Sequence, residues 1–361
     1  MEKLAQRAVV IVLCGLLLGL GVLFWLLPDQ AVSASERRRL AQFPAPSWST
    51  LHSGEWMDKL EDYYLDQFPG REGFRAAKAI TALAAGRQDV NGLYRWQGGI
   101  YKQEYPLNAD QLTYGAKTIN RLYETCLKDM RVFYGVIPDK SCYAAGPAGQ
   151  LQLSLDALRS QLREEIDPTI GEIDLTGCLT AKDYYLTDPH WRQDRLDGVV
   201  QQLSAALDLT LPAAEEYTAV SEPFLGAYAG QLALPVDAEP LVWLESDALC
   251  AATVGTMDTG TVTGLYPAPA GMDGYDRFLG GAAAVQVLDN PSADTDRELL
   301  LFRDSFGSSL APLLLEGYRR ITLIDLRYIS TDRLSQQVRF EDQDVLILLS
   351  TLVWNHAAIL R

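Results

Sequence analysis

Histidine is scarce in this sequence, which contains only three: His52, His190 and His356. His52 lies in a polar amino-terminal stretch, and His356 lies at the extreme carboxy end. Only His190 has a carboxylate two residues before it, that of Asp188, and a tryptophan directly after it, Trp191. A carboxylate commonly fixes the tautomer and orientation of a histidine base. Any acid–base chemistry is therefore expected at His190.

Cysteine is also rare, and its five copies form no C-x-x-C pair, which argues against a zinc site. Cys14 lies within a long apolar run. The other four are Cys126, Cys142, Cys178 and Cys250, an even number in a compartment that we expect to be oxidising. One disulfide, for example Cys142 with Cys178, and four free thiols are both compatible with this spacing.

Positive charge is in deficit, with 31 Lys and Arg against 47 Asp and Glu and a formal net charge of −16. Such a balance excludes the nucleic-acid-binding class, which presents basic surfaces. It also disfavours attachment to a bare anionic membrane surface, whereas a neutral or zwitterionic glycan, or a cationic partner, suits it. Hydrophobic residues make up 48% of the 361, enough for the core of one large or two modest domains.

A long uncharged run occurs once, from Ala8 to Leu27. As a helix it would cross a hydrocarbon core of about 30 Å. Lys3 and Arg7 precede the run and are expected to stay in the cytoplasm. Val32-Ser33-Ala34 offers small residues for cleavage of a signal peptide, but the run is longer than signal peptides use. We therefore expect a single-pass cell-membrane protein whose main domain is extracytoplasmic.

Three parts follow from these patterns. Residues 1–30 are predicted to form a cytoplasmic tip and transmembrane anchor, and 31–100 a stalk with amino-terminal helices. Residues 101–361 alternate short apolar runs with helical patterns, which predicts an α/β domain with a parallel sheet flanked by helices. The predicted strands are Arg131–Ile137, Ile170–Leu175, Glu298–Phe302, Arg320–Ile324 and Asp344–Leu349. Residues 217–290, rich in Gly, Ala, Thr and Pro, are predicted to be a β-rich insertion without a clear helix.

The apolar run Leu299–Phe302 is followed at once by Asp304 and Ser305. Sites in parallel α/β sheets form beyond the carboxyl ends of the strands, so Ser305 is expected there, at the first turn of a helix. Helix amides at such a position can stabilise an oxyanion. The alternative is that Asp304 or Ser305 only caps the helix. If this segment meets Asp188 and His190, a nucleophile, a base and an orienting carboxylate come together.

Three of the candidate site residues also have an ordinary structural explanation. Asp188 could instead cap a helix that begins near Gln193. Lys140 follows a predicted strand and the Pro138-Asp139 pair, so it could border a site or be an ordinary solvated lysine. Arg327, which also follows a predicted strand, could face a substrate or pair with Asp325.

The segment Asp188-Pro189-His190-Trp191 resembles the signature of the DHHW proteins, which are similar to the alginate O-acetylation proteins and their SGNH-hydrolase-like domain. The resemblance extends along most of the chain. The other segments that carry it are the amino-terminal anchor, Ser35-Glu36 to Pro44, Asp66-Gln67-Phe68-Pro69-Gly70-Arg71, Pro138-Asp139-Lys140, Asp304-Ser305-Phe306-Gly307 and Asp325-Leu326-Arg327-Tyr328. Three places depart from the family's pattern: Pro189 replaces a histidine, Arg303 replaces a glycine, and alanines follow Gly280-Gly281.

This resemblance implies an SGNH-hydrolase-like fold and a serine-dependent O-acetyltransferase, with Ser305 as nucleophile, His190 as base and Asp188 as orienting group. It implies that a membrane-bound O-acyltransferase supplies the acetyl group, which a hydroxyl of a cell-surface polysaccharide receives. An acetyl-esterase and a non-catalytic, glycan-binding scaffold remain alternatives. We expect no cofactor, no metal and no nucleic-acid partner.

The resemblance also implies residues for the oxyanion or the substrate. The backbone amide of Ser305 would bind the oxyanion, and Arg327 would assist it. Lys140 and Gly281 are the remaining candidates for the oxyanion or substrate side of the site.

Overall fold

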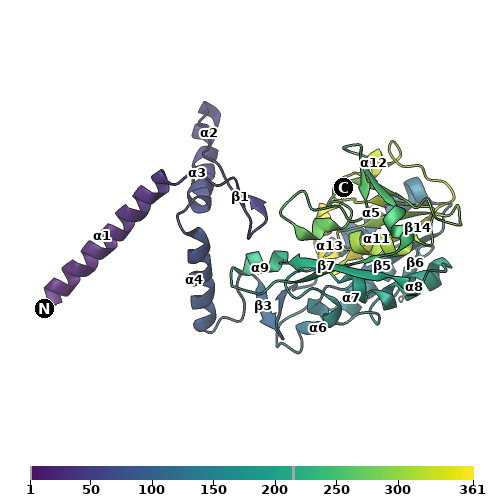
Figure 1. Ribbon diagram of the computed structural model, residues 1–361, viewed down its shortest axis with the longest axis horizontal. Helices are drawn as coiled ribbons and strands as arrows, with labels where there is room; N and C mark the ends of the chain where they lie inside the picture. Colours follow the sequence, from purple (N-terminus) through teal and green to yellow (C-terminus); the bar gives the residue numbers. More distant parts are fainter. Residues whose placement is uncertain (1, 214–215) are drawn as a thin grey trace. The chain divides into compact units, whose positions relative to one another are not determined.

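The computed structural model describes residues 2–213 and 216–361 (Figure 1). The chain divides into two compact units. One comprises Met1–Asn91 with Ala229–Pro235, and the other comprises Gly92–Tyr228 with Val236–Arg361. All five cysteines are free thiols, so the possible Cys142–Cys178 disulfide is not formed.

The first unit begins with α1 (Glu2–Leu26), of which Lys3–Leu26 is long and apolar enough to cross a membrane. A short ribbon and three helices follow: β1 (Val32–Ser33), β2 (Arg38–Arg39), α2 (Trp48–Ser53), α3 (Glu55–Asp66) and α4 (Arg71–Ala84). The ring of Phe24 lies 5.6 Å from that of Tyr63 and 4.9 Å from that of Tyr64. The end of α1 is thereby packed against α3.

The second unit is built on an eight-stranded sheet with the order β10-β9-β11-β13-β12-β14-β5-β6. Its strands are β5 (Val132–Ile137), β6 (Gly171–Ile173), β9 (Thr253–Thr256), β10 (Thr261–Gly264), β11 (Val285–Asp289), β12 (Glu298–Arg303), β13 (Arg320–Ile324) and β14 (Asp344–Ser350). The five strands from β13 to β6 are parallel, as predicted. Strands β11, β9 and β10 extend the sheet in antiparallel pairs, so the sheet as a whole is mixed.

The predicted β-rich segment therefore does not stand apart as an insertion, because three of its strands belong to the main sheet. Its other two strands, β7 (Thr218–Phe224) and β8 (Glu239–Glu245), form a separate antiparallel pair. Short helical segments also occur in it, contrary to the expectation of no clear helix: α9 (Ala227–Leu232), α10 (Asp247–Ala251) and η5 (Gly274–Arg277).

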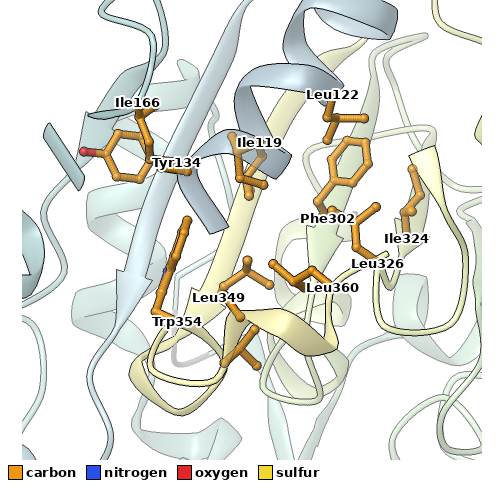
Figure 2. Close-up of a cluster of buried hydrophobic side chains, with 14 of the residues drawn as sticks. Ile119, Leu122, Tyr134, Ile166, Phe302, Ile324, Leu326, Leu349, Trp354 and Leu360 are labelled. Atoms are coloured by element: carbon orange, nitrogen blue, oxygen red, sulfur yellow. The ribbon is translucent and has the colours of Figure 1, made fainter. Parts of the chain in front are cut away.

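Helices cover both faces of the sheet, which confirms the predicted α/β class. Alternate side chains of β12 point to opposite faces, as strand geometry requires. Leu300 and Phe302 enter one apolar cluster, and Leu299 and Leu301 enter the other. Figure 2 shows the first cluster, in which Ile119 and Leu122 of α5 (Ala109–Leu122) lie near Phe302. Burying each such side chain contributes roughly 1.5–3 kcal/mol.

The remaining elements connect these layers. A hairpin of β3 (Leu93–Trp96) and β4 (Gly99–Lys102) turns at Gly98. The larger helices are α5 (Ala109–Leu122), α7 (Leu155–Glu165), α8 (Asp197–Leu207) and α11 (Gly307–Leu315). The shorter ones are η1 (Tyr123–Leu127), α6 (Ser141–Ala144), η2 (Ala181–Asp183), η3 (Gln193–Arg195), α12 (Thr331–Leu334), α13 (Thr351–Trp354) and η6 (Ala357–Ile359).

Candidate active site

The turn between β12 and α11 places Ser305 at the carboxyl edge of the sheet. Asp304 holds this turn, because one carboxylate oxygen accepts a hydrogen bond from the Phe306 amide at 3.1 Å. The other accepts from the Ser350 amide at 2.8 Å, at the end of the neighbouring parallel strand β14. Asp304 thus caps the turn and ties two strand ends together, which leaves the Ser305 hydroxyl directed elsewhere.

The structure brings Asp188, His190 and Ser305 into one hydrogen-bonded chain. His190 Nδ1 lies 2.6 Å from Asp188 Oδ1, and His190 Nε2 lies 2.7 Å from Ser305 Oγ. When Nδ1 carries the proton and donates it to Asp188, Nε2 is free to accept the serine hydroxyl proton. Asp188 is 1% exposed and His190 9%, so water screens this chain weakly.

Asp188 is ionised where it lies. Burial raises the pKa of Asp188, but His190 and the hydrogen bonds to the carboxylate outweigh this and lower it to about 2. Besides His190, the carboxylate accepts from the Ala227 amide at 2.8 Å. The alternative of a helix cap is wrong, because η3 begins at Gln193 without a side-chain cap.

Glu239, from β8, holds the backbone just before Asp188. Its carboxylate accepts hydrogen bonds from the amides of Leu186 and Thr187, both at 2.7 Å, and from the Thr187 hydroxyl at 2.6 Å. The Thr187 hydroxyl oxygen in turn accepts from the Gly226 amide at 2.8 Å. Only glycine fits at this last position, since a Cβ would lie 2.2 Å from the Thr187 carbonyl oxygen. The loop that carries Asp188 and His190 is therefore fixed by residues distant in sequence.

Lys140 lies beneath the same loop and is 1% exposed, so a solvated loop lysine is wrong. Its ammonium donates to the carbonyls of Tyr185 at 2.9 Å and Leu186 at 3.2 Å. The rings of Tyr101 and Tyr228 lie 4.9 and 5.2 Å from Nζ. Burial lowers the pKa of Lys140 to about 8, although nearby carboxylates act against this. The structure places Lys140 where it can fix the loop from below.

Arg327 forms a two-pronged pair with Asp325, at 2.9 Å from Nε and 2.6 Å from one terminal nitrogen. This is the pairing alternative that the sequence left open, and the Arg327 side chain is still 23% exposed. Arg303, where the family's pattern has glycine, is buried and donates to Gln286 Oε1 at 2.7 Å. Its guanidinium also lies 3.8 Å from Asp325, so Arg303 supports the pair from inside.

Gly281 occupies a tight turn with a φ of +96°, a conformation that favours glycine. A Cβ there would lie 2.7 Å from Asp276 Oδ1, so the turn itself accounts for the glycine. Among the hydrogen bonds of the described residues, the one that Gly281 donates goes to the Phe278 carbonyl at 3.4 Å. The structure thus does not bring Gly281 into hydrogen-bond contact with Ser305 or His190.

Tyr275, which the sequence analysis missed, stacks on His190. The two ring centroids are 3.8 Å apart and the planes differ by 7°. Glu239 and Gly226 were missed as well. All three come from the β-rich segment, and no local pattern around them marks a link to a histidine far earlier in the chain.

Fold and site together define an α/β domain that carries a Ser-His-Asp constellation. Comparison by sequence matches no protein-family model and no curated protein. Comparison of structures finds a DHHW family protein from Eubacterium siraeum, at 18% identity and a TM-score of 0.61, covering 74% of this chain and 93% of that chain. The fold of the second unit is thus that of the DHHW proteins, as the resemblance implied.

Bacillus cereus PatB1 is similar too, at 16% identity and a TM-score of 0.57, covering 73% of this chain and 96% of that chain. A structure of PatB1 with a sulfonyl adduct matches at 14% identity and a TM-score of 0.57, covering 73% and 97%. At these identities the likeness concerns the fold.

Proposed function

We propose that this protein is a membrane-anchored, extracytoplasmic O-acetyltransferase that modifies a cell-surface polysaccharide through an acetyl-serine intermediate on Ser305. The observation that carries the proposal is the chain of hydrogen bonds from Asp188 through His190 to Ser305, at 2.6 and 2.7 Å. A serine joined in this way to a histidine and a buried carboxylate is an activated nucleophile. The DHHW-like fold supports the same reaction class.

In the first half of the reaction, Ser305 Oγ attacks the carbonyl carbon of an acetyl ester while His190 Nε2 takes the hydroxyl proton. The imidazolium that forms is stabilised by the Asp188 carboxylate. When the bond from the acetyl carbon to the donor's oxygen breaks, His190 returns the proton to that leaving oxygen. Ser305 then carries the acetyl group as an ester.

In the second half, a sugar hydroxyl attacks the acetyl-serine. His190 takes the hydroxyl proton, the bond to Ser305 Oγ breaks, and His190 gives the proton back to Ser305. The sugar leaves with the acetyl group and the enzyme is restored. Water in place of the sugar would make the same chain an acetyl-esterase.

The negative charge that develops on the acetyl oxygen needs a donor. We assign this role to the backbone amide of Ser305, for which no acceptor is found within residues 2–213 and 216–361. It lies in the turn just before Gly307, the first residue of α11, on the side of the helix where its dipole favours negative charge. Arg327, held by Asp325 and partly exposed, is the second candidate for the substrate side.

The anchor and the partner belong to the same proposal. Lys3 and Arg7 keep the amino-terminal tip in the cytoplasm, α1 crosses the membrane, and the second unit works outside. A membrane-bound O-acyltransferase would supply the acetyl group across the bilayer. The net charge of −16 suits a neutral glycan better than an anionic one.

The test uses the full-length protein in nanodiscs with a chromogenic acetyl ester, with and without a neutral polysaccharide acceptor. We expect ester cleavage that depends on Ser305 and acetyl transfer to the polysaccharide when it is present. Cleavage without transfer would favour the esterase. If the wild type cleaves no ester and Ser305→Ala binds glycan as the wild type does, the scaffold is the correct function.

A further inference from the structure

Tyr275 lies flat against the imidazole of His190, with 3.8 Å between centroids and 7° between planes. We infer that Tyr275 is a positioning residue for the acetyl transfer: its ring holds the imidazole in line and stabilises the imidazolium that forms during each half-reaction. This inference rests on the proposed function, because it assigns a role to Tyr275 in the chemistry of His190.

Tyr275 is held by hydrogen bonds at its hydroxyl and at its backbone amide. Its hydroxyl is 2.9 Å from Ser309 Oγ on α11, and its backbone amide donates to Asp273 Oδ1 at 2.9 Å. Ser309 Oγ also accepts from the indole of Trp191 at 2.9 Å, next to His190 in sequence. Because α11 and the histidine loop share this anchor, the plane of the Tyr275 ring is set relative to both Ser305 and His190.

The electrostatics of the ring match the charge that the reaction places on His190. The face of an aromatic ring is negative and attracts a cation that lies over it. A neutral imidazole gains less from that face than an imidazolium does, so the contact favours the charged state that the transition state needs. Burial raises the pKa of Tyr275 well above its usual value, so the ring stays a neutral phenol.

The ring of Phe306 also contacts the imidazole of His190, but it is tilted and not stacked. The two ring centroids lie 4.9 Å apart, and their planes differ by 57°. Phe278 packs on Tyr275 at 5.0 Å, in the same apolar cluster. Phe278 therefore serves as a matched control, because its replacement loosens the cluster and leaves the ring on His190 in place.

The experiment measures acetyl-ester turnover of the full-length protein and compares Tyr275→Phe with Tyr275→Leu. Tyr275→Phe keeps the ring and loses only the hydroxyl, so kcat is expected to stay within about threefold of the wild type. Tyr275→Leu removes the ring face, so kcat and kcat/KM are expected to fall together by about tenfold, with KM unchanged. Phe278→Leu is expected to lower the melting temperature and leave kcat within about twofold.

Equal turnover in Tyr275→Leu and the wild type would overturn the inference. A loss of turnover in Tyr275→Phe as large as that in Tyr275→Leu would overturn it too, since the hydroxyl and not the ring face would then matter. A tenfold loss in Phe278→Leu would show that loosened packing is the cause. If Tyr275→Leu does not fold, Tyr275→Met, which keeps side-chain length without an aromatic face, takes its place. A wild type that neither turns over nor forms an acetyl adduct would refute the proposed function itself, which these variants cannot do.

Discussion

The parallel strands and the β-rich segment contribute to the candidate site in different ways. Strand β12 delivers Ser305 through regular structure, a buried strand followed by a turn and a helix. The segment from β7 to β11 contributes contacts that hold the loop of Asp188 and His190: Glu239 and Gly226 on the loop backbone, and Tyr275 on the imidazole. Ser305 is thus placed by local structure, whereas His190 is placed by contacts over long sequence distances.

The largest effect is expected on the side of the parallel strands. Ser305→Ala removes the nucleophile, so turnover of a chromogenic acetyl ester should fall at least about 10³-fold. Ser308→Ala, one turn further along the chain, is the matched control and should keep turnover within about twofold. Residual turnover in Ser305→Ala above a tenth of the wild type would mean that another group attacks the ester.

Removing the charge on Asp188 comes next. Asp188→Asn presents an amide where His190 Nδ1 and the Ala227 amide both donate, so the imidazole loses the partner that fixes its tautomer. We expect kcat to fall by about 10³- to 10⁴-fold. The measurement is steady-state turnover, and unchanged secondary structure by circular dichroism is the control. A loss below tenfold would contradict the role of Asp188.

Glu239 tests the β-rich side alone, since it touches the loop and not the imidazole. Glu239→Gln replaces one carboxylate oxygen by an NH2 group, which cannot accept a hydrogen bond from the three donors around it. The substitution should lower the free energy of unfolding by about 1–3 kcal/mol. Turnover should fall as well, by about tenfold, because the loop that carries Asp188 loosens. Thermal unfolding and turnover are the measurements.

The matched control for Glu239 is Glu222→Gln on the neighbouring strand β7. Glu222 pairs with Arg277 and its side chain is 30% exposed, so its loss should cost less than about 1 kcal/mol. Equal effects of the two substitutions would mean that the β7–β8 pair stabilises the loop only by being folded, and not through the Glu239 carboxylate.

The smallest effect is the pH dependence of stability that Asp188 contributes. The pKa of Asp188 is lowered to about 2, below its unfolded value, so its contribution is full above about pH 4 and is lost as pH falls through about 2. The stability difference between the wild type and Asp188→Asn should therefore shrink as the pH falls from about 4 to about 2. Thermal unfolding at several pH values in this range measures it, and a difference that grows as the pH falls from about 4 to about 2 would contradict the assignment.

The sequence predicted the parallel part of the fold well, for physical reasons. Short apolar runs such as Leu299–Phe302 are typical of buried strands, and the residues that follow them must lie at one edge of the sheet. That placed Ser305 at the carboxyl edge. The segment Asp188 to Trp191 was linked to Ser305 through the resemblance to the DHHW proteins, and the structure joins the two through His190.

The β-rich side could not be predicted in the same detail. Strands β9 and β10 are short and exposed on part of their surface, and nothing in four residues indicates which neighbour a strand will pair with. The sequence left open whether Lys140 borders a site or is a solvated lysine, because the carbonyls and rings that enclose it come from three distant segments. Tyr275 gave no signal for the same reason, since its partner His190 lies far away in the chain.

The central claim is an acetyl-serine at Ser305, and the most direct measurement is intact mass spectrometry of the full-length protein, acid-quenched during turnover of an acetyl ester. The account predicts one added acetyl group that maps to the peptide containing Ser305 and is missing in His190→Ala. An acetyl group on any other residue, or rapid turnover by the wild type with no adduct at any quench time, would contradict it.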